Sequence, residues 1–146
     1  MSRDRKIADA LESAVARTFS EMAFLDTVPA GPCRVGPVDR SFAIQVWGAE
    51  THRLVLDLPL PAMRTIVENI HALDWDELSA SDVDDCLLEF LNVLAGTFGR
   101  LYWGDSSRYR LSLPEIRPGS NTEPDAHPAT TFWFDAQGEQ LAVHVQ

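Results

Sequence analysis

The sequence is poor in cysteine and in basic residues, and each shortage excludes a class of protein. Two cysteines, Cys33 and Cys86, are too few for the disulfide framework of a small secreted domain, and they favour two thiols in a reducing cytoplasm over one disulfide. Lys and Arg number 12 against 22 Asp and Glu, which leaves a formal net charge of −10. Because nucleic acids and anionic membranes are bound by clustered cations, neither is expected as a partner.

Long hydrophobic runs are also missing. No stretch approaches the roughly 18 apolar residues of a membrane-spanning helix, and the opening residues, MSRDRKIADA, contain no hydrophobic signal core. With 146 residues, of which 45% are hydrophobic, the chain is long enough for a domain with its own core. The expectation is a single cytoplasmic domain that spans residues 1–146.

Hydrophobic periodicity predicts helices in the first half of the chain. Apolar residues recur at intervals of three and four over residues 5–23, which is typical of an amphipathic helix. Pro61 suits the first turn of a second helix, whose buried stripe is expected to be Met63, Ile66, Val67 and Ile70. A third helix is predicted from about residue 80 to 102, because Ser79 and Asp82 have the spacing of a capping box.

Alternating segments predict the strands. SFAIQVWG and THRLVLDL alternate around Gly48 and indicate a β-hairpin. Three more strands are expected in RYRLSLPEI, TTFWFD and EQLAVHV, and the last two are expected to form a hairpin around Gly138. A polar, proline-rich loop at residues 117–129 separates the first two. The predicted order is α-β-β-α-α-β-β-β. This order favours an α+β layered fold, in which a mainly antiparallel sheet packs against helices.

The third helix has two contrasting faces. The apolar side is expected to pack on the sheet and consists of Leu87, Leu91, Leu94, Phe98 and Leu101. The opposite side is a narrow stripe formed by Asp85, Glu89, Asn92, Gly96 and Arg100. A helix turns about 100° per residue, so Glu89 and Asn92 are neighbours on this stripe. Gly96 costs the helix about 1 kcal/mol relative to Ala, but it leaves no side chain that could block a partner.

Taken by spacing alone, such a stripe is usually a solvated surface. A resemblance to a known family gives the stripe a second interpretation. DCLLEFLNVLAGTFG, followed by YRLSLPEIRPG, resembles the central region of the CheX/CheC chemotaxis phosphatase family, which includes the FliY type. The positions that match the family pattern are Asp85, Glu89, Asn92, Ala95, Gly96, Leu111, Ser112 and Pro114.

Two positions depart from the family pattern. Thr97 stands directly after the helix glycine, where CheX proteins often have Asn. On the first helix, Glu12 is followed three residues later by Val15 instead of an amide, so only one E-x-x-N motif is present. One active face is therefore expected, which makes the chain more similar to CheX than to CheC or the flagellar switch phosphatases.

The resemblance implies hydrolysis of the aspartyl phosphate on a CheY-like response regulator, in chemotaxis or two-component signalling. In this interpretation Glu89 and Asn92 are catalytic, with Asn92 orienting the hydrolytic water and Glu89 pairing with a lysine of the regulator. Partner contacts are expected from Asp85, Gly96 and Arg100. The chain would need no cofactor or metal of its own, because the Mg²⁺ belongs to the acidic pocket of the regulator. A homodimer is a further expectation from the resemblance.

Other interpretations stay open. A non-catalytic CheX-like module could bind a response regulator or another chemotaxis partner, and Thr97 gives this alternative its weight. A structural protein that self-associates through exposed sheet edges is the third possibility. Metal chemistry is disfavoured because the histidines are widely separated and lack metal-ligand spacing: His52, His71, His127 and His144.

Overall fold

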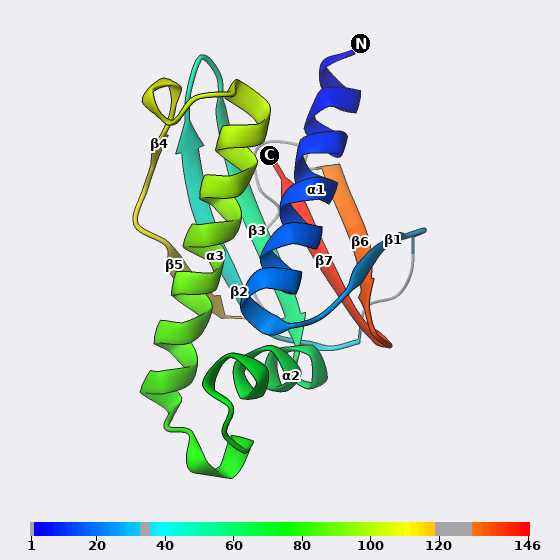
Figure 1. Ribbon diagram of the computed structural model, residues 1–146, viewed down its shortest axis with the longest axis vertical. Helices are drawn as coiled ribbons and strands as arrows, with labels where there is room; N and C mark the ends of the chain where they lie inside the picture. Colours follow the sequence, from blue (N-terminus) through cyan, green and yellow to red (C-terminus); the bar gives the residue numbers. More distant parts are fainter. Residues whose placement is uncertain (1, 33–35, 119–129) are drawn as a thin grey trace.

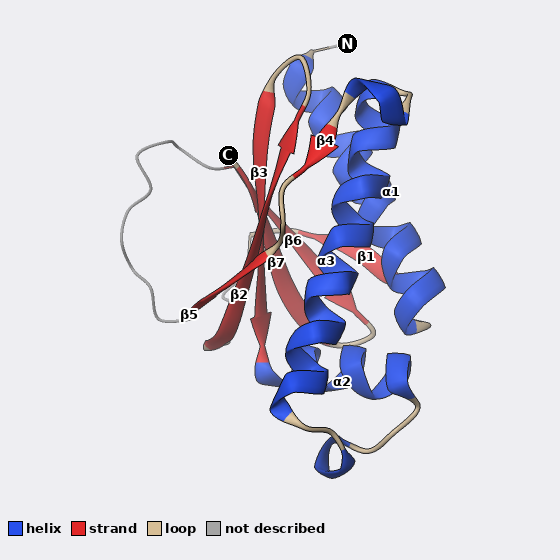
Figure 2. Cartoon of the chain, turned by 90° about the vertical axis from the view of Figure 1, so that its left-hand side faces the viewer, coloured by secondary structure: helices blue, strands red, loops and turns tan. Residues whose placement is uncertain are grey.

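The computed structural model describes residues 2–32, 36–118 and 130–146, and it confirms the predicted α+β class and element order. Over those residues, three α-helices cover one face of a seven-stranded antiparallel sheet, which Figure 2 shows nearly edge-on. The elements along the chain (Figure 1) are α1 Arg3–Ala23, β1 Thr27–Ala30, β2 Val38–Trp47, β3 Thr51–Pro59, α2 Leu60–His71, the 3-10 turn η1 Trp75–Glu77, α3 Ala80–Trp103, the 3-10 turn η2 Ser106–Arg108, β4 Arg110–Leu111, β5 Glu115–Pro118, β6 Thr130–Ala136 and β7 Glu139–Val145.

The strand order is β1-β6-β7-β3-β2-β4, and β5 also pairs with β2. Both predicted hairpins, β2–β3 and β6–β7, form antiparallel pairs. The second hairpin turns at Gln137 and Gly138, whose φ angles of 52° and 96° lie in the left-handed region that glycine tolerates best. The turn signal at Gly138 therefore identified the connection correctly.

Two strands differ from the expectation. β1 lies in a proline-rich stretch for which no strand was predicted, and it pairs with β6 at the edge of the sheet. An edge position tolerates Pro29, because the missing N–H can face away from the ladder. The single strand predicted in RYRLSLPEI is instead divided into β4 and β5, with residues 112–114 between them.

The helices bury the faces that the periodicity indicated. On α1, which begins after a Ser2 cap, the side chains of Ile7, Leu11, Val15 and Phe19 are buried. On α2, Met63, Ile66 and Val67 are buried, whereas Ile70 is partly buried against the same core. The core lies between the helices and the sheet, where Phe19 of α1 meets Phe90 of α3 with ring centroids 4.9 Å apart.

The other face of the sheet carries a polar network. Asp57 on β3 accepts a hydrogen bond from Ser41 on β2 and is hydrogen-bonded to His144 on β7, which in turn contacts Thr131 on β6 at 2.8 Å. Burial disfavours a charged Asp57, but these hydrogen bonds, with the charges of His144 and Arg117, outweigh burial and lower its pKa. The network joins four neighbouring strands.

Among the helices in the described part of the chain, none is both long and apolar enough to cross a membrane. Most of the predicted loop at 117–129, together with Cys33 and His127, lies outside the described residues.

Candidate functional site

Helix α3 carries the candidate site, and its two ends are defined by local interactions. The Ser79 hydroxyl accepts a hydrogen bond from the Asp82 backbone N–H at 3.0 Å, and the Asp82 carboxylate accepts one from the Ser79 N–H at 3.2 Å. This reciprocal pair is the predicted capping box. The helix ends at Gly104, whose φ of 86° is costly for any residue with a Cβ atom.

The inner face of α3 matches the prediction except at one position. Leu87, Leu91, Leu94 and Phe98 are fully buried. The prediction that Leu101 packs on the sheet is wrong, because its side chain is 37% exposed. At this end of the helix Tyr102 turns inward instead, and its hydroxyl donates to Glu50 at 2.8 Å.

The outer face of α3 presents the predicted stripe to solvent. Asp85, Glu89 and Arg100 are exposed, whereas Asn92 and Gly96 are half-buried. Within the part of the chain that the structure describes, the side chains of Glu89 and Asn92 make no hydrogen bond or ion pair. A carboxylate and an amide one helical turn apart are thus both available to a partner.

Thr97, which departs from the family pattern, does not lie on this stripe. Its side chain is only 7% exposed, and its hydroxyl donates to the backbone carbonyl of Val93 at 2.9 Å. Such a hydrogen bond to the preceding turn is a common way for a helical Thr to satisfy its hydroxyl. The residue at position 97 therefore serves the helix and does not reach a partner docked on Glu89 and Asn92.

The two glycines of α3 have different surroundings. A Cβ atom on Gly96 would meet only the Cδ1 atom of Leu111, at 3.8 Å, which is an ordinary contact. A Cβ atom on Gly99 would lie 2.6 Å from the ring of Tyr109, and that ring is fixed by stacking on Trp103 and by a 2.8 Å hydrogen bond to the Gly96 carbonyl. Gly99 is therefore required for close packing, whereas Gly96 is not. The sequence pattern did not identify Tyr109, because its contact with α3 depends on the tertiary fold.

The edge of the sheet flanks the stripe. β4 and β5 pair with β2 and run beside α3, which Figure 2 shows in the foreground. Leu111, Ser112 and Pro114, which match the family pattern, lie on this edge segment. Of these, Leu111 lies directly beside Gly96. Two sequence motifs that are separated by about twenty residues therefore meet on one side of the molecule.

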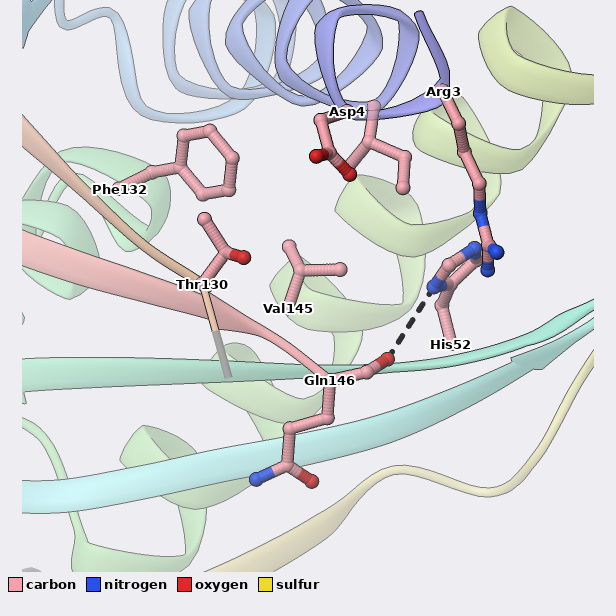
Figure 3. A pocket seen from close by; sticks show the side chains of 8 residues that line it. Arg3, Asp4, His52, Thr130, Phe132, Val145 and Gln146 are labelled. Atoms are coloured by element: carbon pink, nitrogen blue, oxygen red, sulfur yellow. Dashed lines mark hydrogen bonds between the residues drawn. The ribbon is translucent and has the colours of Figure 1, made fainter. Parts of the chain in front are cut away.

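A pocket near the N-terminus of α1 is a second candidate. It has a volume of about 240 Å³ and lies between α1 and the ends of β6 and β7 (Figure 3). Its basic side chains already have partners: Arg3 pairs with Glu50, and His52 bonds both Glu50 and the Gln146 backbone carbonyl. Burial opposes ionisation of Glu50, but hydrogen bonds from Tyr102 and His52 and the charges of His52 and Arg3 lower its pKa. These contacts connect the start of α1 to the β2–β3 turn and engage both basic side chains of the pocket.

Metal-binding and thiol chemistry find no support in the described residues. No group of three or more His, Cys, Asp or Glu in that part of the chain is arranged to hold a metal ion. His52 and His144 are engaged in the hydrogen bonds described above, and His71 is exposed on α2. Cys86 is buried, and burial raises the pKa of its thiol to about 11, which keeps it protonated and unreactive.

Several solved structures with the same fold are chemotaxis proteins. CheX from Desulfovibrio desulfuricans has 17% identity and a TM-score of 0.76, over 96% of this chain and 97% of that chain. CheX from Vibrio vulnificus has 15% identity and a TM-score of 0.77, over 95% and 97%. A complex of CheX with CheY, BeF3 and Mg²⁺ from Borrelia burgdorferi has 13% identity and a TM-score of 0.68, over 99% and 96%. No protein-family model and no curated protein matches the sequence.

These comparisons cover nearly the whole chain. The protein therefore has the CheX-like fold, as the resemblance implied. At 13–17% identity the likeness concerns the fold, so the chemistry of the site has to be argued from its own residues.

Proposed function

We propose that this chain is a phosphatase that hydrolyses the aspartyl phosphate of a CheY-like receiver domain. The observation that carries the proposal is the pair Glu89 and Asn92, which lie one turn apart on the outer face of α3 without partners among the described residues. Gly96 leaves the following turn open. The choice of partner is supported by the CheX-like fold and by the Borrelia burgdorferi complex, in which a CheX protein binds CheY.

The reaction requires no covalent bond between the phosphoryl group and this chain. In hydrolysis a water oxygen forms a bond to phosphorus and the bond from phosphorus to the aspartyl oxygen breaks, which releases inorganic phosphate and a carboxylate. An acyl phosphate is already activated, so the water needs positioning more than deprotonation. The Asn92 amide can accept a hydrogen bond from this water and hold it in line. Because Asn92 is half-buried, its rotamers are restricted and less entropy is lost on positioning.

Glu89 has a different role in this proposal. A carboxylate would be repelled by a phosphoryl group, so Glu89 is unsuited to contact it. Instead it pairs with a cation of the receiver domain, for which the proposed residue is a lysine, and thereby aligns Asn92. Asp85 and Arg100 lie on the same stripe and add charged contacts at its two ends. Any Mg²⁺ would be held by carboxylates of the receiver domain.

A non-catalytic binding module is the alternative, and its main support was Thr97. Since the Thr97 side chain is buried and bonded to Val93, the substitution leaves the stripe unchanged. The phosphatase is therefore the better supported of the two functions, and one assay separates them.

The assay measures phosphate loss from CheY-like receiver domains of the same organism after charging with acetyl phosphate. The wild-type chain is expected to accelerate the loss for its cognate domain. Asn92→Ala is expected to lower this acceleration at least 100-fold or so, the size of effect that follows from misplacing a reactant. Gln140→Ala, which removes an exposed amide from β7, is the matched control and should retain full activity. Binding of a receiver domain without acceleration would establish the non-catalytic alternative.

A further inference from the structure

A bulge interrupts the sheet edge beside the E-x-x-N stripe. On this edge Leu111 is opposite Val46 and Ile116 is opposite Phe42 of β2. Five residue steps on the edge therefore match four steps on β2, so one extra residue must project from the ladder. Bulges of this kind change the direction of a side chain, and here the displaced segment is residues 112–114.

Ser112 holds the bulge in place. Its backbone N–H donates to the Gln45 carbonyl at 2.9 Å, and its hydroxyl accepts from the Gln45 N–H at 2.9 Å. The hydroxyl thereby replaces the carbonyl that a regular ladder would supply to Gln45. Ser112 thus satisfies both the backbone N–H and the backbone carbonyl of Gln45. The edge segment therefore leaves the sheet at a fixed point, immediately before Leu113.

The segment presents an unusual amount of apolar surface. The Leu113 side chain is 90% exposed, Ile116 is 38% exposed and Leu111 is half-buried. We call these three residues the apolar strip. A single exposed leucine is ordinary on a protein surface. An almost fully exposed leucine that directly follows a hydrogen-bonded bulge is a preformed contact point at this edge of the sheet.

The apolar strip runs alongside Glu89 and Asn92. Leu111 lies beside Gly96, and the edge segment descends where α3 ascends (Figure 1). The four steps from Val46 to Phe42 cover about 13 Å, a height that corresponds to about nine residues of an α-helix. Counted back from Gly96, this distance passes both Asn92 and Glu89. A partner seated on the stripe would therefore meet the apolar strip as well.

We propose that Leu113 is the apolar anchor for the receiver domain when Asn92 reaches its phosphoryl group. This inference rests on the proposed function and names a further residue of the same interface. Glu89 lies within the same height on α3, so the surface fits a partner with an apolar patch beside a cation. With a net charge of −10 and the Glu89 carboxylate near the strip, a second copy of the chain is disfavoured as the occupant.

The test compares Leu113→Ser with Val28→Ser. Val28 is 59% exposed on β1, at the opposite edge of the sheet, and is a matched loss of exposed apolar surface. The probe is the cognate receiver domain activated with beryllofluoride, and its Kd is measured by calorimetry. Leu113→Ser is expected to raise the Kd about tenfold or more, as loss of a buried leucine contact implies. Single-turnover phosphate loss at saturating enzyme should stay within about twofold of wild type, because Leu113 contacts no reacting atom.

The other outcomes distinguish the two proposals. If wild type binds and hydrolyses but Leu113→Ser has the same Kd as Val28→Ser, the anchor is wrong and the phosphatase proposal stands. If wild type neither binds nor accelerates any receiver domain of the organism, both proposals fall. Leu113→Met, which keeps the apolar volume, should bind with nearly the wild-type Kd, and a Kd as high as that of Leu113→Ser would overturn the anchor. Loss of a dimer in Leu113→Ser, with receiver binding intact, would assign the surface to a second copy instead.

Discussion

Helices α1 and α3 lie side by side and antiparallel on the same face of the sheet (Figure 1), yet of the two only α3 has a glutamate and an amide three residues apart toward solvent. On each helix a glutamate can be compared with the residue three positions after it, which is where the E-x-x-N motif has its amide. On α3 these are Glu89, which is exposed, and Asn92, which is half-buried. On α1 they are Glu12, which is half-buried, and Val15, which is fully buried.

The difference teaches that spacing alone does not define a functional face. A step of three residues brings two side chains to the same side of any helix, but the core decides whether that side is covered. On α1 the second position points into the core, where an apolar residue is required. On α3 the same spacing is rotated toward solvent. This rotation is a physical reason to expect one active face instead of two.

Installing the missing amide on α1 should therefore damage the protein without creating a second site. Val15→Asn places an unsatisfied amide in the core and removes a buried apolar side chain, at a cost of about 3 kcal/mol. The free energy of unfolding, measured by urea titration, is expected to fall by this amount. Ser13→Asn, on the exposed face of the same helix, is the control and should be nearly neutral. The distinction between the two helices would be wrong if Val15→Asn were as stable as wild type and the double variant Val15→Asn/Asn92→Ala had phosphatase activity.

The two glycines of α3 should respond in opposite directions. Gly99→Ala places a Cβ atom 2.6 Å from the Tyr109 ring and is expected to destabilise the protein by about 1–2 kcal/mol, even after the gain in helix propensity. Gly96→Ala meets only an ordinary contact and should be neutral or stabilising by up to about 1 kcal/mol. Gly96→Leu should keep the fold but weaken receiver binding. Thermal melts with a receiver titration measure both effects, and a large drop in Tm for Gly96→Leu would mean that the functional face lies elsewhere.

Reversing the charge of Glu89 should weaken the complex more than the equivalent change on α1. Glu89→Lys would oppose two cations at the interface and is expected to raise the Kd for the activated receiver domain about tenfold, with a smaller rise for Glu89→Ala. Glu21→Lys, on the exposed face of α1, has the same change in net charge and controls for long-range electrostatics. Equal affinity of wild type and Glu89→Lys would remove the proposed ion pair.

The smallest effect is expected for Glu50, which contacts both helices. Glu50, in the β2–β3 turn, pairs with Arg3 of α1 and accepts a hydrogen bond from Tyr102 of α3. Its pKa in the folded protein is lowered from the ordinary value of 4.5, so its stabilisation is present above that pH and is lost as the pH falls through the folded pKa. Wild type should exceed Glu50→Gln in unfolding free energy at pH 7, and the difference should shrink below about pH 4.5. A difference that is constant from pH 7 to pH 3 would contradict this assignment.

Much of the fold was predictable because its signals are local. The capping box at Ser79 and Asp82 located the start of α3, and alternation located β2 and β3. β1 was missed because Pro29 reads as a turn residue, and only pairing with β6 makes the segment a strand. The break between β4 and β5 depends on the hydrogen bonds of Ser112 to Gln45, which are 67 residues apart.

The candidate site was predictable in outline only. Helical periodicity placed Glu89, Asn92 and Gly96 on one outer stripe, as the structure has them. Periodicity also placed Leu101 inward, but near the end of a helix the neighbouring elements decide which side is covered. Gly99 and Leu113 gave no sequence signal, since the packing of one and the exposure of the other follow from tertiary contacts.

The most direct measurement separates binding from turnover for Asn92. If the Asn92 amide positions the hydrolytic water, Asn92→Ala should bind the beryllofluoride-activated receiver domain with a Kd within about twofold of wild type. At saturating concentrations of the variant, phosphate loss in a single turnover should fall to nearly the rate of the receiver domain alone. A single-turnover rate equal to that of wild type would contradict the assignment of Asn92 and, with it, a catalytic role for the outer face of α3.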